Sequence, residues 1–271
     1  MIETKKFYTI TNEAVFYYCI GNDLNKAKIF IEQIINIKIK DIRFASNKLL
    51  KDYMNSKDRF LDYLVLTDIG YINIEINNYN TSWRIDRDVM YVSKILTNTI
   101  KKKETYKEVK KVIQINISRL GRTEEEKGLY KLRLDKEIKG FKKTLTEMIE
   151  IYVVNIDFYK EMVYNGNKKF IEDNYLVCAM DLDKKELDNI SEGNKILMEV
   201  KKALEEINNN EDFVNWMSAE EETEMVKRTL IADAKEEGLA EGIEQGTKQR
   251  SIEIAKNMLL EDSNINYISK I

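Results

Sequence analysis

Two carboxylates and one amide occupy neighbouring segments of the chain, at positions where they could share one face of a small sheet. Asp62 lies in a run of large apolar residues, whereas Glu75 and Asn77 lie in the alternating segment Tyr71–Asn77. The intervening Asp68–Ile69–Gly70 favours a turn, because glycine tolerates positive φ and aspartate is common in turns. We therefore expect a hairpin that brings Asp62 opposite Glu75 or Asn77, or within about one residue of that position.

The register of this hairpin decides which face Asp62 takes. The alternation of Tyr71–Asn77 predicts a half-buried strand with three isoleucines on one face and Asn73, Glu75 and Asn77 on the other. If paired residue numbers add up to an odd number, Asp62 shares the polar face, and an even sum places it among the isoleucines. We expect the odd register, because it buries no isolated carboxylate.

Two carboxylates beside an amide, with no basic side chain nearby, suit a hard divalent cation that prefers oxygen ligands. Mg²⁺ or Mn²⁺ held by Asp62 and Glu75 could activate water and neutralise charge on a phosphodiester. Acidic pairs are also common on the exposed faces of ordinary amphipathic hairpins. The spacing alone therefore leaves both interpretations open.

The segment Ile74–Glu75–Ile76–Asn77 resembles the Ile-Glu-x-Gln motif of the PD-(D/E)XK nucleases, specifically of the transposase-like branch known as recombination-promoting nucleases. The resemblance implies that Asp62 and Glu75 bind a catalytic metal and that Asn77 takes the third catalytic position. Asn77 departs from the motif, because it keeps the amide of glutamine but is one methylene shorter. Its shorter reach could misplace the attacking water by about 1 Å, which can lower the rate strongly.

The family opens with Asn-Asp, two residues and Phe-Lys, and the chain is similar at Asn12, Glu13 and Phe16, with Tyr17 in place of the lysine. The resemblance makes Glu13 a candidate third carboxylate of the metal site. Thr11–Asn12 is, however, also an ordinary helix cap. Glu13 could equally be a first-turn acid that the helix macrodipole favours.

The segment Trp83–Lys103 has the periodicity of a helix, and its apolar positions should face the sheet. These positions are Val89, Val92, Ile95, Leu96 and Ile100. Arg87 and Tyr91 are four residues apart and share one face, and the family has a similar Arg-x-x-x-Tyr. Arg87 could hold a phosphate or orient Glu75 through a charge-assisted hydrogen bond, and a surface pair with Asp88 or a nearby glutamate is the alternative.

The densest basic run of the chain follows at the end of this helix. Its members are Lys101, Lys102, Lys103, Lys107, Lys110 and Lys111. Such a patch could bind the phosphate backbone of DNA beside the metal site. Glu104 and Glu108 interrupt the run, however, and runs of lysine often form only a solvated helix end.

Further segments supply the framework around these residues. They are a helix over Leu24–Ile35 and strands over Val109–Ile117, Leu129–Ile138 and Glu147–Phe158. Val109–Ile117 also resembles the third core strand of the family. Together with the resemblance, this order predicts an α/β (α+β) fold, namely a restriction-endonuclease-like mixed central sheet flanked by helices with a helical C-terminal extension.

Three regions are expected along the chain: a nuclease-like core at 1–158, a helical buttress at 159–218 and a charged helical tail at 219–271. In the tail, Gly238, Gly242 and Gly246 repeat every four residues, a spacing that allows close approach of helices. The charged residues around them exclude a membrane dimer. We expect the tail to mediate homo-oligomerisation or to bind another partner.

Composition excludes several other classes of protein. The chain has no histidine, which removes the Ser-His and Cys-His hydrolases and histidine-ligated zinc sites. Its 271 residues contain no phosphate loop of the GxxxxGK type, no run of 18 apolar residues and no signal-peptide pattern. We therefore expect a cytoplasmic protein that does not enter membranes. With a net charge of −3, any binding of nucleic acid should be local.

These features together favour a metal-dependent DNA endonuclease that hydrolyses phosphodiester bonds. The resemblance links such an enzyme to recombination and mobile elements and implies that its partner is DNA. The alternative is a catalytically impaired relative that serves as a DNA-binding or protein-interaction module. The shortened side chain of Asn77 and the interrupted lysine run motivate this alternative.

Overall fold

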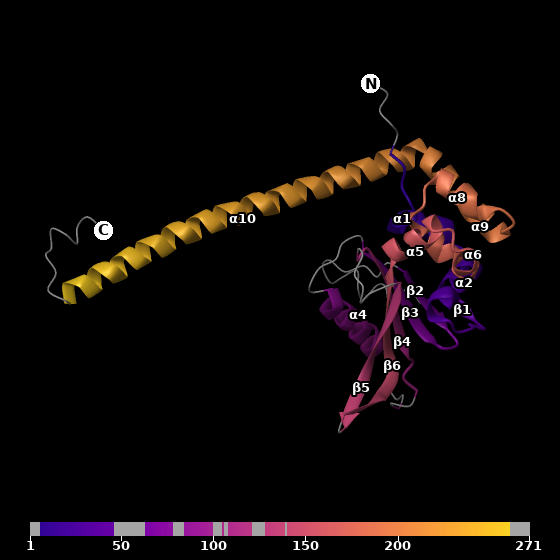
Figure 1. Cartoon of the computed structure of the whole chain (residues 1–271), viewed down its shortest axis with the longest axis horizontal. Helices are drawn as coiled ribbons and strands as arrows, with labels where there is room; N and C mark the ends of the chain where they lie inside the picture. Colours follow the sequence, from indigo (N-terminus) through magenta and orange to yellow (C-terminus); the bar gives the residue numbers. More distant parts are fainter. Residues whose placement is uncertain are drawn as a thin grey trace. The chain divides into compact units, whose positions relative to one another are not determined.

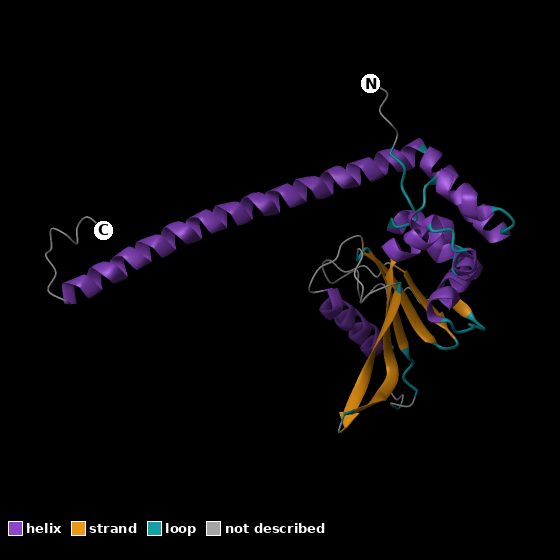
Figure 2. Ribbon diagram, viewed as in Figure 1, coloured by secondary structure: helices purple, strands orange, loops and turns teal. Residues whose placement is uncertain are grey.

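The computed structural model describes residues 6–45, 63–77, 84–99, 105, 108–120, 128–138 and 140–260. By its contacts the chain forms two units, Met1–Asn210 (unit 1) and Glu211–Ile271 (unit 2). Unit 1 is a mixed α/β structure with one sheet flanked by helices (Figures 1 and 2). The described part of unit 2 is one long helix. The expected α/β fold, with its mixed sheet and helical extension, is confirmed.

The sheet has six strands in the order β1-β2-β3-β4-β6-β5. The strands are β1 (Ile42–Phe44), β2 (Tyr63–Thr67), β3 (Gly70–Asn77), β4 (Val112–Ser118), β5 (Leu129–Ile138) and β6 (Phe141–Asn155). β4 pairs in parallel with both β3 and β6, and the other neighbours are antiparallel. The carboxyl ends of β3, β4 and β6 therefore lie at the same edge of the sheet.

The hairpin of β2 and β3 forms around the expected turn. Gly70 has a φ of 140°, and a Cβ atom there would lie 2.3 Å from the carbonyl oxygen of Lys111. Only glycine allows the two backbones to come this close. Tyr63 pairs with Ile74, so paired residue numbers add up to an odd number, which is the expected register.

Helix α4 (Arg84–Asn98) covers one face of the sheet (Figure 1). Val92 and Ile95 of this helix are fully buried, as expected from the sequence. They belong to an apolar cluster that includes Leu64, Val112, Ile151 and Val153 of the sheet. Burial of this cluster fixes α4 against β3 and β4, where the candidate site lies.

The opposite face is covered by the N-terminal helices. They are α1 (Glu13–Phe16), the π-helical turn η1 (Tyr17–Gly21) and α2 (Leu24–Ile35). Asn12 caps α1, as expected, by accepting a hydrogen bond from the backbone N–H of Ala14 at 3.0 Å. The ring of Phe16 meets that of Tyr63 edge to face, with 5.7 Å between centroids. This contact joins α1 to the side of β2 that faces away from α4.

Six short helical segments follow β6 and complete unit 1. They are α5 (Ile156–Tyr164), α6 (Lys168–Asp173), α7 (Tyr175–Cys178), η2 (Ala179–Asp181), α8 (Lys184–Ser191) and α9 (Lys195–Asn209). Asn208 in α9 binds the backbone of Tyr8. It accepts from the Tyr8 N–H at 2.7 Å and donates to the Tyr8 carbonyl at 3.0 Å. The end of unit 1 is thereby tied to its beginning.

A partly buried ion-pair cluster joins the segment after β4 to α5 and η2. Arg119 donates to Asp181 through both terminal guanidinium nitrogens, and the Lys160 ammonium lies 3.3 Å from the same carboxylate. Burial alone would raise the pKa of Asp181, but the hydrogen bonds and charges of Arg119 and Lys160 hold this pKa below its ordinary value. The cluster therefore holds Asp181 in its ionised form.

Unit 2 contains α10 (Glu211–Leu260), a continuous helix of 50 residues. Large apolar side chains are exposed along it, including Met225, Leu230, Ile231, Leu239 and Ile243. A Cβ atom on Gly238, Gly242 or Gly246 would meet no atom within 4 Å. No helix among the described residues has both the length and the apolar content that are needed to cross a membrane.

Some boundaries differ from the expectation. β6 begins at Phe141 rather than at Glu147, because it continues the hairpin with β5 around Gly140, whose φ is 81°. The sequence pattern of a strand is weak there, because the apolar residues of this hairpin end, Phe141 and Leu145, are 80% and 63% exposed and do not alternate regularly with polar ones. The described part of α4 ends at Asn98.

Candidate functional site

The polar side of β3 is buried, and the expectation of a half-buried strand is wrong. Asn73, Glu75 and Asn77 are only 0%, 4% and 5% exposed. These side chains lie on the face that α4 covers, because Asn73 is paired with Leu64 of the apolar cluster under that helix. A strand that carries three polar side chains into a buried face must satisfy them with other side chains.

Strand β4 supplies these partners through a matching series of polar residues. The parallel register pairs Asn73 with Gln114, Glu75 with Asn116, and Asn77 with Ser118. Asn73 Nδ2 donates to Gln114 Oε1 at 2.9 Å and to Glu75 Oε1 at 3.1 Å. Two adjacent parallel strands thus present a ladder of amides around one carboxylate.

Glu75 is the titratable group at the centre of this ladder. The pKa of Glu75 is raised to about 7, chiefly by burial and in smaller part by the negative charges of Glu13 and Asp88. The hydrogen bond from Asn73 and the charge of Arg87 act in the opposite direction. The site therefore concentrates negative charge where water has little access, and one guanidinium offsets only part of it.

Asn77 and Arg87 are in direct contact. Arg87 Nη2 donates to Asn77 Oδ1, and Asn77 Nδ2 donates to Asn116 Oδ1 at 2.5 Å. The guanidinium carbon of Arg87 lies 5.7 Å from the centre of the Tyr91 ring, a distance at which a cation and an aromatic ring attract each other. The structure thus brings Arg87 and Tyr91 together, as their spacing predicted, and binds both ends of the Asn77 amide.

Asp88 is fully buried, at 0% exposure, whereas Val89 is 48% exposed. The expectation that Val89 faces the sheet is wrong, because Asp88 faces the sheet at this end of α4, whereas Val92 and Ile95 face it as expected. Asp88 takes the inward position since its Oδ2 accepts a hydrogen bond of 2.5 Å from Asn116 Nδ2. Arg87 and Asp88 do not form a surface pair either, because Asp88 points inward.

The remaining predicted residues divide into two groups. Glu13 is an exposed residue at the start of α1, and its charge acts on Glu75. Asp62, which directly precedes β2 in the sequence, lies outside the described residues, and so do Lys101, Lys102 and Lys103. The described part of the predicted site is therefore Glu13, Glu75, Asn77, Arg87 and Tyr91.

Four further polar residues of this region were not predicted to belong to the site. They are Asn73, Asp88, Gln114 and Asn116, all fully buried. One signal could have revealed two of them. Gln114 and Asn116 alternate with isoleucines in Val112–Ser118 in the same way as the polar residues of β3 do in Tyr71–Asn77. Two core strands with the same polar alternation predict a ladder between them.

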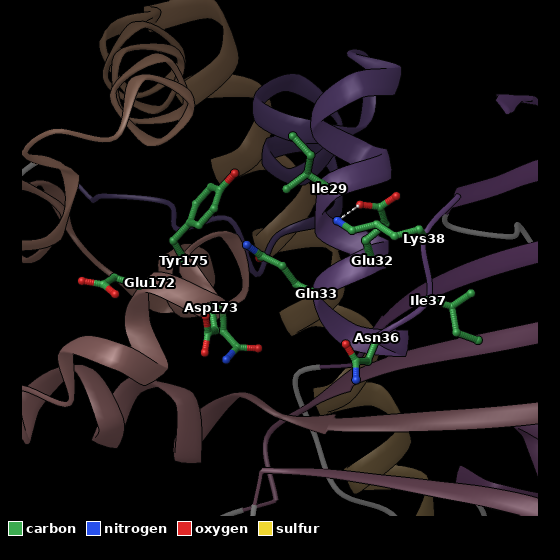
Figure 3. Close-up of a pocket in the computed structure, with 10 residues that line it drawn as sticks. Ile29, Glu32, Gln33, Asn36, Ile37, Lys38, Glu172, Asp173 and Tyr175 are labelled. Atoms are coloured by element: carbon green, nitrogen blue, oxygen red, sulfur yellow. Dashed lines mark hydrogen bonds and ion pairs between the residues drawn. The ribbon is translucent and has the colours of Figure 1, made fainter. Parts of the chain in front are cut away.

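A cavity of about 760 Å³ lies elsewhere in unit 1, between α2 and the segment Glu172–Tyr175 (Figure 3). Two of its polar side chains are bound within the chain: Glu32 accepts from Lys38 at 2.8 Å, and Gln33 Oε1 accepts from the Leu176 N–H at 3.1 Å. None of the predicted site residues that the structure describes lines this cavity. It is separate from the candidate site.

The sheet and its buried acid define the class of protein. A mixed sheet with a carboxylate near the carboxyl ends of two parallel strands, flanked by helices on both faces, is consistent with a restriction-endonuclease-like fold. The family described as PD-(D/E)XK nuclease family transposase matches residues 11–234. The chain belongs to this family. It matches no curated protein and no solved structure.

Nucleases of the PD-(D/E)XK type generally use divalent metals, and the donor chemistry of this site fits such an ion. Glu75 offers hard carboxylate oxygens, and the nearby charges of Glu13 and Asp88 favour a cation in the same place. The described residues contain no group of three or more metal-binding side chains. Asp62, the other carboxylate expected to bind the metal, lies outside them.

Proposed function

We propose that the chain is a divalent-metal-dependent DNA endonuclease of the recombination-promoting branch, with Mg²⁺ or Mn²⁺ as its metal. The observation that carries this proposal is the environment of Glu75. Its carboxylate is 4% exposed, and Glu13 and Asp88 add negative charge around it. Such an arrangement costs folding free energy unless a cation offsets it, so it supports a role in binding one.

The proposal assigns a role to each residue of the site. Asp62 and Glu75 would hold the metal with help from Glu13, and the bound metal would activate water and neutralise charge on the phosphodiester. Arg87 would stabilise the negative charge of the phosphate. Asn77 holds Arg87 through its amide oxygen, so its contribution would depend on the position of that guanidinium.

DNA would pass beside the site along basic side chains. Tyr91 packs against Arg87 and would limit its movement. Lys101, Lys102 and Lys103 follow α4 in the sequence and would neutralise backbone phosphates. Binding that rests on such contacts weakens as the salt concentration rises, which separates it from binding by metal coordination.

The test is cleavage of supercoiled plasmid in Mg²⁺ or Mn²⁺ by the full chain. Glu75→Gln is the informative variant, because it removes the charge but keeps an oxygen that can accept the hydrogen bond from Asn73. Asp62→Asn tests the second ligand. The matched control is Glu147→Gln, which changes an exposed glutamate of β6.

We expect the wild type and Glu147→Gln to cleave only with metal, and Glu75→Gln and Asp62→Asn to lose at least about 100-fold in rate, the scale seen when an electrostatic group of an active site is removed. Wild-type protein that leaves the plasmid intact in both metals, or a Glu75→Gln variant that cuts at the wild-type rate, would contradict the proposal.

A DNA-binding or protein-interaction module is the second candidate function, and one observation favours it. Both ends of the Asn77 amide are bound, one to Arg87 and one to Asn116, so this amide is held by contacts within the protein and keeps only one N–H and one oxygen lone pair for a water molecule. The two functions differ in a simple measurement. A module would bind a fluorescent duplex in EDTA as tightly as in Mg²⁺ and would not cut it in either.

We also propose that α10 mediates self-association. A helix of 50 residues gains most of its stability from packing of an apolar face, yet Met225, Ile231 and Leu239 are each more than half exposed. Light scattering of the full chain and of a variant without residues 219–271 tests this part. A mass per particle equal to one chain in both proteins would contradict it.

A further inference from the structure

Four side chains form a continuous hydrogen-bonded series across the candidate site, from one residue of α4 through two strands and back to the same helix. Asn116 Nδ2 donates to Asp88 at 2.5 Å. Asn77 Nδ2 donates to Asn116 Oδ1, also at 2.5 Å, and Arg87 donates to Asn77 Oδ1. Asp88, Asn116 and Asn77 are at most 5% exposed, so water does not compete freely for these groups.

The chemistry of the two ends gives this series a single direction. A carboxylate only accepts hydrogen bonds, so Asp88 requires that Asn116 turn its NH₂ group toward α4. The Asn116 oxygen must then face β3 and take a donor from Asn77. The oxygen of Asn77 is left to face Arg87, which as a guanidinium only donates. Each donor thus meets an acceptor along the whole series.

We propose that Asp88 is a positioning residue: through Asn116 it holds the amide of Asn77 with its oxygen toward Arg87. This inference rests on the proposed function only in its consequence for cleavage, since the series itself is a property of the folded chain. Arg87 is the residue that would meet the phosphate. The proposal extends the site to two residues, Asp88 and Asn116, that lie outside the motif of the family.

The orientation matters because an amide can rotate by half a turn without changing its shape. With Asn77 reversed, its NH₂ group would point at the guanidinium of Arg87 and its oxygen at the oxygen of Asn116. Both contacts repel, and Arg87 would lose the acceptor that Asn77 supplies. Ser118 supports the same direction, because its hydroxyl donates to Asn116 Oδ1 at 3.0 Å.

A charge swap tests the direction of the series. Asn77→Asp places a carboxylate at each end of Asn116, which has only one NH₂ group, so one carboxylate must face an oxygen. Asp88→Asn removes this conflict: the new amide can donate to Asn116 Oδ1, and Asn116 can donate to the carboxylate at position 77. The double variant Asn77→Asp/Asp88→Asn keeps the total charge, reverses the two bonds that Asn116 makes and keeps the bond that Arg87 donates to position 77.

The measurement is urea unfolding of the full chain in EDTA, for the wild type, both single variants and the double variant. We expect Asn77→Asp to lower the folding equilibrium constant at least about tenfold more in the wild type than in the Asp88→Asn background, the size of coupling found between groups in contact. Equal cost in both backgrounds would overturn the proposal, because it would show that position 88 does not govern position 77.

The matched control uses Asp181→Asn, another buried acid changed to its amide, in the cluster with Arg119. Asp181→Asn should not reduce the stability that Asn77→Asp takes from the protein in urea unfolding. If the swapped double variant does not fold, the cycle is repeated with Asn116→Asp, whose carboxylate accepts from Asn77 and needs a donor at position 88. Rescue of Asn116→Asp by Asp88→Asn supports the series, and its absence overturns it.

Unfolding and cleavage separate the two proposals of this site. Coupling between positions 77 and 88 in a chain that cuts no DNA would keep the positioning role and refute the nuclease. Metal-dependent cleavage, together with additive effects of the substitutions at positions 77 and 88 on stability, would keep the nuclease and refute the positioning role. In an active chain, Asp88→Ala should lower kcat more than it changes KM, because it disturbs the placement of Arg87 and leaves the DNA-binding lysines in place.

Discussion

The charge of Glu75 should destabilise the metal-free protein, and the size of this effect follows from its surroundings. Burial raises the pKa of Glu75 from 4.5 to about 7. One pKa unit corresponds to about 1.4 kcal/mol, so the full difference is worth about 3 kcal/mol. Because the folded state holds the proton more tightly than the unfolded state, stability falls as pH rises between these two values and stays low above pH 7.

Glu75→Gln removes this charge and keeps the shape of the side chain. We expect the variant to be more stable than the wild type by about 3 kcal/mol at pH 8 and by little at pH 4.5, where most of the penalty is absent from both proteins. Urea unfolding in EDTA at the two pH values measures the difference. A functional group that lowers stability in this way is common at active sites.

Two controls make this experiment decisive. Glu147→Gln changes an exposed glutamate and should leave the stability unchanged at both pH values. A gain for Glu75→Gln that is equal at pH 4.5 and pH 8 would show that shape rather than charge is responsible. A loss of stability at pH 8 would refute the reasoning, because it would mean that the folded chain stabilises the ionised carboxylate.

Three further changes have outcomes set by the structure. Asp181→Ala should lower the free energy of unfolding by about 3 kcal/mol, because it leaves Arg119 without its buried partner. In the wild type this contribution is lost as pH falls through the lowered pKa of Asp181. Urea unfolding of the variant and a pH series of the wild type measure the two effects, and an unchanged unfolding midpoint would contradict them. Gly70→Ala should lower the melting temperature by several degrees, on the order of 2 kcal/mol, because its Cβ would collide with the carbonyl of Lys111. Ile95→Ala opens a cavity under α4 and should cost about 3 kcal/mol in urea unfolding, and a cost below about 1 kcal/mol would show that the helix repacks.

Much of the framework around the site could be predicted from local patterns. The turn at Gly70 follows from Asp68–Ile69–Gly70, and the odd register of the hairpin is the one that we expected, although the face that it gives to Glu75 is buried rather than exposed. Helix α2 has the expected bounds, Leu24–Ile35, because its apolar spacing and its capping residue Asp23 agree. Where local sequence signals agree with one another, a single sequence is enough to predict an element and its bounds.

The burial of polar residues could not be predicted in the same way. Asn73, Glu75 and Asn77 looked solvent-facing because an alternating strand usually has one wet face. Their burial depends on partners that are about 40 residues away in β4, such as Asn116 for Asn77. The inward position of Asp88 depends on the same strand. Such pairs appear only when the parallel register of two strands is known.

The bond between Tyr8 and Asn208 has a consequence for how the protein is made. The two residues are 200 positions apart, and at about 5–20 residues per second their synthesis is separated by roughly 10–40 s. During that time the N-terminal segment lacks the side chain that satisfies its backbone. Unit 1 can close only after α9 has been made, while the 50 residues of α10 are still being added. The addition of α10 thus coincides with an interval in which unit 1 can close.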